Sequence, residues 1–369
     1  MSGVERQDLT AACHRDGAFH QALEVLQAAA QRTRTGVVCL AVPLAPEGRL
    51  GWSEQVDLGA ARHKAFVLAQ HLRLVRRAKL PLRSGHPVLV REFSTLPLWL
   101  VAPALYRWRS RLLFVVNHNL QWALNQRSEA WAFRRLHRAG FRFAFFETME
   151  APVLREWGFE RSQHVILRHP VPDIRGRIAA SASDRPFIGL AGHFRPEKGM
   201  IEALRVLDGE PKLRERIAIG LPNPPEFLRA YGAGRKAVQT PRLFHTASDE
   251  DFRAFLARCG VIVLNYAARD YAWRPSGLMA DCAAAGTPVV IPDLPVQREQ
   301  LQWPTPIGEV FQELEELPRA VFQALEKGAW GGYGFDAYRA ARGIAATAAA
   351  LDAIWTPPEN RTRGTPGRS

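Results

Sequence analysis

The segment Gly192-His193-Phe194-Arg195-Pro196-Glu197-Lys198-Gly199 follows an apolar run, and about eighty residues later Arg274-Pro275-Ser276-Gly277 leads to Asp281 and Gly286-Thr287-Pro288. Each segment comes after a run typical of a buried strand, at 187–191 and 261–264, and opens a run typical of a helix. Free backbone N–H groups and the positive end of the helix dipole attract anions at such a junction. The two segments together predict a cradle for the phosphates of a nucleotide diphosphate.

Strand-like and helix-like runs alternate along the whole chain, and this repeated alternation predicts parallel sheets covered by helices on both faces. In the first half we expect strands at 9–13, 36–42, 87–91, 112–117, 142–146 and near 165, with helices at 18–31, 58–78, 97–107 and 120–138. In the second half we expect strands at 187–191, 216–220, near 243, at 260–265 and 288–291, with helices at 199–207, 225–231, 249–258 and 277–285.

The segment 170–184 has two prolines and a run of alanine and serine, which is typical of a linker between domains. At 369 residues the chain is too long for one ordinary core. The sequence therefore predicts an α/β protein with two Rossmann-like, doubly wound domains, at 1–175 and 186–332, facing each other across a cleft. A C-terminal helix within 333–355 is a candidate to pack back on the first domain, and 356–369 has the composition of a disordered tail.

Composition and the N-terminal sequence exclude several classes of protein. Apolar residues make up 47% of the chain and charged residues 23%, which indicates a globular rather than a disordered protein. Residues 1–8 carry acids and no apolar core, and the longest apolar segment, 96–106, is too short to span a bilayer. We therefore expect a cytoplasmic protein. The four cysteines, Cys13, Cys39, Cys259 and Cys282, are widely spaced and are expected to be buried free thiols.

The net charge of +13 is unevenly distributed, because residues 1–180 carry a balance of +12 and the remainder +1. The basic residues fall into three groups, Arg73, Arg76, Arg77, Lys79 and Arg83, then Arg107, Arg109 and Arg111, then 134–142. Basic side chains interleaved with Trp, Phe and Leu suit an anionic membrane surface. A solvated basic face and a nucleic-acid surface are the alternatives, and nucleic acid is the least favoured.

Residues 186–300 resemble the nucleotide-sugar-binding half of glycosyltransferases with two Rossmann domains (GT-B), most closely those of family four. The first half is similar only in its order of elements. The family's Gly-Arg-x-x-x-Glu-Lys-Gly segment corresponds to residues 192–199, from Gly192 onward, which implies that Lys198 binds the donor diphosphate. The family's arginine corresponds to His193 here, and Arg195 is a candidate to replace it.

The resemblance extends to the second segment with one departure. The family has two glutamates eight positions apart, and the second corresponds to Asp281, which is implied to bind the donor ribose. The first glutamate corresponds to Trp273, which has no carboxylate. The backbone N–H groups of Ser276 and Gly277 are implied to contact the diphosphate, with Arg274 as an additional cation.

The chemistry of these residues agrees with the resemblance. A leaving nucleoside diphosphate develops negative charge, which lysine, arginine and helix N-termini stabilise. The sequence has no Asp-x-Asp pair at a strand end, so we expect neither a bound metal nor a cofactor other than the nucleotide sugar itself.

In the first half, His118 follows a strand-like run, at the sheet edge where open α/β sheets bind ligands. The resemblance implies that His118 contacts the donor sugar or the acceptor as the catalytic histidine, and a turn histidine between asparagines is the alternative. The loop 14–17 follows the first strand in the same way, so Asp16 is either a base or a solvated acid.

Other polar and aromatic residues near strand ends have two readings each. Glu147 and Glu150 are either site carboxylates or the start of the next helix, and we favour the helix start. His169 resembles a hinge element of this fold with a structural role. The loop residues Tyr266, Asp270 and Tyr271 either select the donor sugar or pack the loop.

The sequence thus predicts a metal-independent glycosyltransferase that moves a sugar from a nucleotide diphosphate sugar to a glycan or lipid-linked acceptor held by the first domain. Family four implies retention of anomeric configuration. We expect a role in cell-envelope polysaccharide synthesis, and the basic first half suggests a peripheral position on the inner face of the membrane. Two alternatives remain. Trp273 is consistent with a binding or scaffold protein of the same fold, and a nucleotide-sugar epimerase would share the architecture.

Overall fold

The computed structural model describes residues 17–42, 60–172, 187–222, 224–232 and 242–356. The predicted strand at 9–13, Asp16, most of the linker predicted at 170–184 and the predicted tail beyond residue 356 lie outside the described residues. The chain divides into two compact units: the second contains Val171–Gly343 together with Gly17–Ala22, the start of the first helix, and the first contains the rest of the chain.

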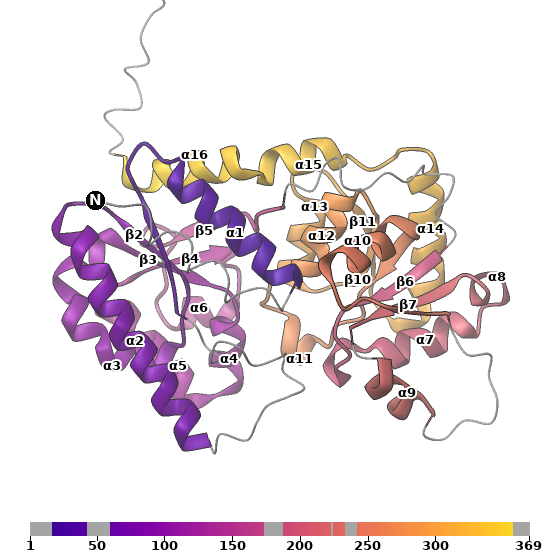
Figure 1. Cartoon of the computed structure of the whole chain (residues 1–369), viewed down its shortest axis with the longest axis horizontal. Coiled ribbons are helices and arrows are strands. Elements are labelled where there is room, and N and C mark those ends of the chain that lie inside the picture. Colours follow the sequence, from indigo (N-terminus) through magenta and orange to yellow (C-terminus); the bar gives the residue numbers. More distant parts are fainter. Residues whose placement is uncertain (1–16, 43–59, 173–186, 223, 233–241, 357–369) are drawn as a thin grey trace, which may run out of the picture. The chain divides into compact units, whose positions relative to one another are not determined.

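The first unit contains a parallel sheet whose described strands run in the order β1-β2-β3-β4-β5 (Figure 1). All four strand pairs are parallel, and the strands β2, β3 and β4 are almost entirely buried, as expected for a sheet covered by helices. The elements, in chain order, are α1 (Gly17–Gln31), β1 (Val38–Ala41), α2 (Ala60–Arg83), β2 (Val88–Glu92), α3 (Thr95–Val101), η3 (Ala102–Arg111), β3 (Leu112–Val116), α4 (Asn119–Asn125), α5 (Arg127–Arg138), β4 (Arg142–Phe146), α6 (Pro152–Glu156), β5 (Val165–Leu167) and α16 (Ile344–Trp355).

Four helices differ from the sequence-based expectation, and the first of them, α2, continues to Arg83 instead of ending at residue 78. The helix expected at 97–107 is the α-helix α3 followed by the 3-10 helix η3, which starts next to Pro103. The helix expected at 120–138 is interrupted at Gln126, which is exposed and has an extended backbone (φ −136°, ψ 118°). The expected C-terminal helix is two helices, α15 (Phe335–Arg342) and α16, separated by Gly343.

The second unit contains a parallel sheet in the order β11-β10-β9-β6-β7-β8. The strand β11 and the helices α8, α11, α13 and α14 of this unit were not predicted. The elements are β6 (Phe187–Ala191), η5 (Pro196–Lys198), α7 (Met200–Asp208), α8 (Pro211–Arg214), β7 (Ile217–Leu221), α9 (Pro224–Gly232), β8 (Arg242–His245), α10 (Asp249–Arg258), β9 (Cys259–Val263), α11 (Ala268–Tyr271), α12 (Gly277–Ala285), β10 (Val289–Pro292), α13 (Pro295–Gln302), β11 (Gly308–Phe311), η6 (Leu314–Glu316), α14 (Leu317–Ala329) and α15.

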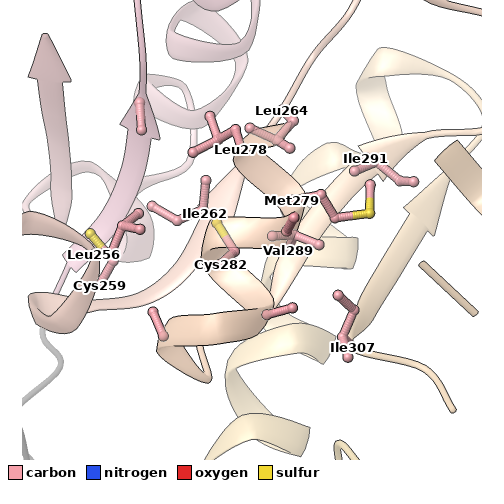
Figure 2. Close-up of a cluster of buried hydrophobic side chains, with 14 of the residues drawn as sticks. Leu256, Cys259, Ile262, Leu264, Leu278, Met279, Cys282, Val289, Ile291 and Ile307 are labelled. Carbon is pink, nitrogen blue, oxygen red and sulfur yellow. The ribbon is translucent and has the colours of Figure 1, made fainter. Parts of the chain in front are cut away.

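The core of the second unit surrounds α12, in which every residue from Leu278 to Ala285 is buried. Figure 2 shows Met279 and Cys282 of this helix among apolar side chains of the strands β9 and β10. Apart from Asp281, α12 is apolar on all sides, which is typical of a helix at the centre of a large core. The buried environment therefore holds α12 in place.

A buried pair of histidines links three elements of the first unit. The Phe143 N–H donates to Nδ1 of His164 (3.2 Å), whose Nε2 lies 3.0 Å from Nδ1 of His137. The second nitrogen of His137 lies 2.9 Å from the Gly158 carbonyl oxygen. All three hydrogen bonds form only if both imidazole rings are neutral and each carries its proton on Nε2. Burial lowers the pKa of His164 to about 3, and His137 and Arg142 add to the shift.

We expect the free energy of unfolding to fall by about 2 kcal/mol between pH 7 and pH 5 because of His164 alone. The folded-state pKa lies below the unfolded value, so the unfolded chain binds the extra proton and stability is lost as the pH falls below about 6.5. Urea unfolding at several pH values measures this slope. In the variant His164→Gln the free energy of unfolding should depend less on pH. The control His86→Gln, at an exposed position, should keep the original dependence. An unchanged slope in His164→Gln would contradict the expectation.

Candidate functional site

The second sheet reverses its direction of winding between β6 and β9. From β6 the order continues to β7 and β8 on one side, and β9 begins the series β9, β10 and β11 on the other. β6 and β9 are parallel neighbours, so the loops that follow them leave the same edge of the sheet. Open α/β sheets bind ligands at this switch point. The two segments singled out in the sequence are the loops that follow β6 and β9.

Two glycines shape the loop after β6. Gly192 has φ 97°, and a Cβ placed there would lie 3.2 Å from the Lys198 Nζ atom. Gly199 has φ 55°, and a Cβ there would overlap the Asn265 carbonyl oxygen. Both positions require the left-handed backbone that glycine adopts without strain. Glycine therefore allows the Lys198 ammonium group to lie over the backbone at Gly192 and the loop to touch the loop after β9.

The two loops are joined by hydrogen bonds. The side-chain amide of Asn265 donates to the Gly199 carbonyl oxygen (2.9 Å), and the Ala267 N–H donates to the Glu197 carbonyl oxygen (2.9 Å). Segments that lie 66 positions apart in the sequence thus form one structure. Neither Asn265 nor Glu197 was predicted to have this role, because no local pattern marks a bond of such long range.

Aromatic rings support Arg274 in the loop after β9. The rings of Tyr266 and Tyr271 are stacked with centroids 4.4 Å apart, and the Arg274 guanidinium lies 4.5 Å from the Tyr271 centroid. Both tyrosines are buried, so they pack the loop. Burial lowers the pKa of Arg274, and the nearby positive charge of Arg195 lowers it further. A half-buried guanidinium beside a second positive charge is stabilised by a nearby negative charge.

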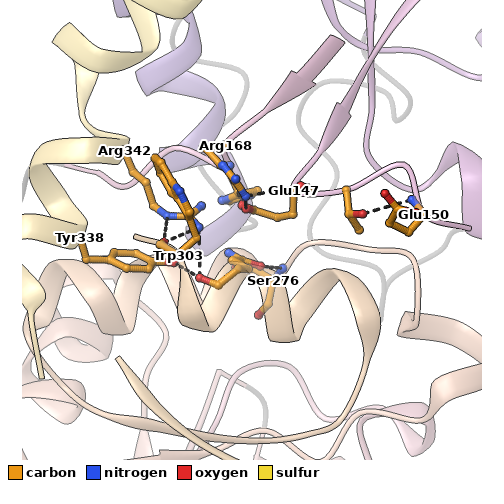
Figure 3. Close-up of polar contacts among 10 residues, drawn as sticks. Glu147, Glu150, Arg168, Ser276, Trp303, Tyr338 and Arg342 are labelled. Carbon is orange, nitrogen blue, oxygen red and sulfur yellow. Dashed lines mark hydrogen bonds and ion pairs between the residues drawn. The ribbon is translucent and has the colours of Figure 1, made fainter. Parts of the chain in front are cut away.

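The N-terminus of α12 is closed on one side by a glutamine. The Ser276 N–H donates to Gln300 Oε1 (2.8 Å), and Gln300 Nε2 donates to the Ser276 carbonyl oxygen (2.9 Å; Figure 3). Ser276 caps the helix through its hydroxyl, which accepts from the Met279 N–H (3.2 Å). The Ser276 N–H is thus already used. Among the described residues, no acceptor is found for the N–H groups of Gly277 and Leu278, the first two of the helix.

Gln300 is itself held by α15. The Tyr338 hydroxyl and an Arg342 N–H donate to the Gln300 carbonyl oxygen at 2.5 and 3.2 Å, and Arg342 also donates to the Trp303 carbonyl oxygen (Figure 3). Tyr338 and Arg342 are fully buried. This support for the Ser276 turn was not predicted from the sequence, because the partners come from helices 24 to 66 positions away.

Asp281 lies in the middle of α12 and is 3% exposed. In the part of the chain that the structure describes, neither of its carboxylate oxygens has a hydrogen-bond partner. Burial raises the pKa of Asp281 well above its usual value, and the carboxylate of Asp249 adds to the shift. A buried carboxyl group without donors is costly, so a ligand with hydroxyl groups would improve its environment. The Thr246 hydroxyl, after β8, is also buried without a partner among the described residues.

His118 lies in the first unit, at the carboxyl end of β3, where it precedes the first turn of α4. The side chain is half-buried, with its ring 5.7 Å from the Trp122 ring and Nε2 3.4 Å from the Asn117 amide. The neighbouring Asn119 donates to the Phe93 carbonyl oxygen (2.9 Å). The asparagines thus fix the turn that carries the imidazole at the edge of the first sheet.

The prediction that Glu147 and Glu150 begin the next helix was wrong, because α6 begins at Pro152. Glu147 has φ 65°, which costs about 1–3 kcal/mol for a residue with a side chain. Its buried carboxylate accepts from the His169 N–H (2.8 Å) and from Arg168 Nη1 (3.1 Å), and these bonds hold the unusual backbone. The pairing of β3, β4 and β5 places His118, Glu147 and Arg168 in successive positions along one sheet edge.

In the described residues, no three His, Cys, Asp or Glu side chains lie close enough together to hold a metal ion.

No protein-family model matches the sequence, and no curated protein matches it significantly. Solved structures do match. A trehalose 6-phosphate synthase from Burkholderia multivorans is 13% identical with a TM-score of 0.54, over 79% of this chain and 76% of that one. A glycosyltransferase from Rickettsia africae is 10% identical with a TM-score of 0.53, and the match covers 92% of this chain and 91% of that one. The Anabaena protein HepE in complex with UDP-glucose is 14% identical with a TM-score of 0.52, over 76% and 81%.

The chain spans 54% of the length of TarM and 55% of that of a TarM mutant, which are two further matches. At these identities the similarity concerns the fold. The two parallel sheets, of five and six described strands, and the structural matches show that the chain has the GT-B fold of two Rossmann-like domains, as the resemblance to family-four glycosyltransferases predicted.

Proposed function

We propose that the chain transfers a hexose-type sugar from a nucleotide diphosphate sugar to a glycan or lipid-linked acceptor. The observation that carries this proposal is the pair of loops at the switch point of the second sheet. They are tied together by Asn265, and they gather the Lys198 ammonium group, the Arg274 guanidinium and the N-terminus of α12. A matched structure of the same fold contains UDP-glucose, which is consistent with a donor of this class.

The diphosphate is assigned to the cations and free amides of these loops. Lys198 is the principal charge, and the N–H groups of Gly277 and Leu278 supply donors at the positive end of α12. Arg274, Arg195 and His193 are further contacts on the same loops, and Ser276 contributes by capping the helix. As the bond to the sugar breaks, charge develops on the leaving diphosphate, and preorganised donors stabilise that charge more than they stabilise the bound donor.

The ribose is assigned to Asp281. Two ribose hydroxyl groups would donate to the two carboxylate oxygens that have no partner among the described residues. Such bonds to a charged acceptor are the stronger kind, and they would favour the ionised form over the protonated form that burial favours.

His118, in the first unit, is assigned to the reacting sugar or the acceptor, and we propose that this unit, spanning roughly residues 1–175, holds the acceptor. Transfer is proposed to proceed with retention and without a metal ion, within cell-envelope polysaccharide synthesis. The second domain is proposed to span 186–332, with the helix within 333–355 returning to the first.

One observation favours a second candidate function. Trp273 is half-buried in the loop before α12, at the position where the family has its first glutamate. A protein that binds nucleotide sugars without transferring them would tolerate this replacement.

Calorimetric titration with UDP-, GDP-, ADP- and TDP-sugars, followed by an assay for transfer to candidate acceptors, separates these functions. Binding with turnover supports transfer, and binding without turnover supports the second candidate. Inversion at the sugar C2 without an acceptor would instead indicate an epimerase. No binding to any of the four classes would contradict the proposal.

The variant Asp281→Ala is expected to change stability and affinity in opposite directions. Without nucleotide, the free energy of unfolding should rise by about 1 kcal/mol, because a buried carboxyl group without partners is removed. Affinity for the donor should fall roughly 10- to 100-fold, since hydrogen bonds to a charged group are lost. Urea unfolding and calorimetric titration measure the two effects. Glu315→Gln, at an exposed carboxylate, is the control, and a variant with lower stability and unchanged affinity would contradict the assignment.

A further inference from the structure

The basic charge of the chain is concentrated in one segment of the first unit. Residues 60–146 contain 16 lysines and arginines and only two acids, Glu92 and Glu129, so this segment carries +14 and the rest of the chain is nearly neutral. Glu129 is buried and Glu92 is half-buried. From residue 64 to 146 the exposed residues therefore include no Asp or Glu.

The same segment exposes large apolar side chains. Leu72 and Leu80 of α2 are 51% and 74% exposed, and the exposed Arg73, Arg76 and Arg77 lie between them in the same helix. Of the ten large apolar side chains that are exposed among the described residues, six lie within this segment. Exposed apolar side chains that gather in one part of a surface, rather than single scattered ones, mark an interaction site.

Aromatic side chains continue this surface on the next helices. Trp131 of α5 is 36% exposed and packs edge-on against Trp99 of α3, with ring centroids 4.4 Å apart. The Arg135 guanidinium lies 5.7 Å from the Trp131 centroid, and Leu100 of α3 is 52% exposed. The helix α3 contacts both α2 and α5, and Figure 1 shows the three helices in the first unit. The exposed residues of these three neighbouring helices are here named the α2–α3–α5 surface.

We propose that the α2–α3–α5 surface docks on an anionic lipid bilayer. Leucine and tryptophan side chains would enter the headgroup level, and the surrounding guanidinium groups would pair with lipid phosphates. Every helix among the described residues is too short or too polar to cross a bilayer, so the contact is with the surface. Nucleic acid would use the same cations, but its phosphate backbone offers no apolar environment for Leu72 and Leu80. The proposal does not depend on sugar transfer, because it involves no residue of the donor loops.

Sedimentation with vesicles tests this proposal directly. The full chain is mixed with vesicles of phosphatidylcholine alone, or of phosphatidylcholine and phosphatidylglycerol in equal parts, at low and physiological salt. We expect binding only to the anionic vesicles, weakened by salt. The variant Arg73→Gln/Arg76→Gln/Arg77→Gln should bind about 100-fold more weakly, because each cation near such a surface contributes roughly fivefold. Leu72→Ser/Leu80→Ser should bind at least about 10-fold more weakly.

Matched variants outside the surface serve as controls. Arg205→Gln/Arg229→Gln/Arg319→Gln removes three exposed cations of the second unit, and Leu228→Ser/Phe322→Ser removes two exposed apolar side chains there. Both should bind like the original chain. All substituted side chains are exposed to solvent. An unchanged thermal unfolding temperature will confirm that each variant folds.

Three results would overturn the proposal. The first is no sedimentation with anionic vesicles at low salt. The second is equal weakening in the control variants. The third is a combined result: only the arginine variant loses binding while the leucine variant keeps it, and duplex DNA displaces the original chain from the vesicles. This result would indicate a nucleic-acid surface.

Discussion

Replacing Lys198 with alanine is expected to lower kcat/KM for the nucleotide sugar by about 100- to 1,000-fold, the usual effect of removing one preorganised donor from developing charge. The ammonium group lies over the backbone at Gly192, at the switch point of the second sheet. Negative charge on the leaving diphosphate would form beside it. Because this charge is greater in the transition state than in the bound donor, kcat should fall more than affinity.

Steady-state kinetics and calorimetric titration measure these two effects of Lys198→Ala separately. Lys198→Arg keeps the charge with a different shape and should recover part of the activity. Lys212→Ala removes an exposed lysine of the same unit and should change neither quantity. Thermal unfolding of the three variants checks that each of them folds. If Lys198→Ala kept both its affinity for every nucleotide sugar and its rate of product formation, the diphosphate assignment would fail.

The parts of the site that were predictable from the sequence are those whose backbone conformation restricts the choice of residue. Gly192 and Gly199 both have positive φ, and such positions select glycine strongly enough to leave a recognisable pattern. The apolar runs at β6 and β9 are equally clear, because both strands are buried on two faces. The junctions that follow these strands could therefore be located without a structure.

The contacts that refine the site were not predictable, because they join segments far apart in the sequence. The family resemblance in the sequence implied that the Ser276 N–H contacts the diphosphate. In the structure this group donates to the side chain of Gln300 in α13, whose carbonyl oxygen accepts from the Tyr338 hydroxyl. Glu147 was expected at a helix start, but its positive φ is maintained by Arg168 and by the His169 N–H from the end of the next strand. Such conformations follow from tertiary contacts, which local patterns do not record.

Replacing Gly199 with alanine tests whether the donor site depends on the junction of the two loops as well as on the charge of Lys198. A Cβ at this position would overlap the Asn265 carbonyl oxygen, so the loops would have to separate. We expect donor affinity to fall about 10- to 100-fold although the lysine is retained. The free energy of unfolding should fall by about 1–3 kcal/mol, from the strained backbone and the steric overlap together.

The matched control for Gly199→Ala is Gly331→Ala, which separates backbone strain from overlap. Gly331 has φ 67°, close to the value at Gly199, but a Cβ there meets no atom within 4 Å. This variant should lose about 1 kcal/mol of stability and keep its affinity for the donor. Calorimetric titration and urea unfolding of both variants give the comparison. If Gly199→Ala behaved like Gly331→Ala in both measurements, the junction at Asn265 would have no part in binding, and Lys198 would act independently of the loop after β9.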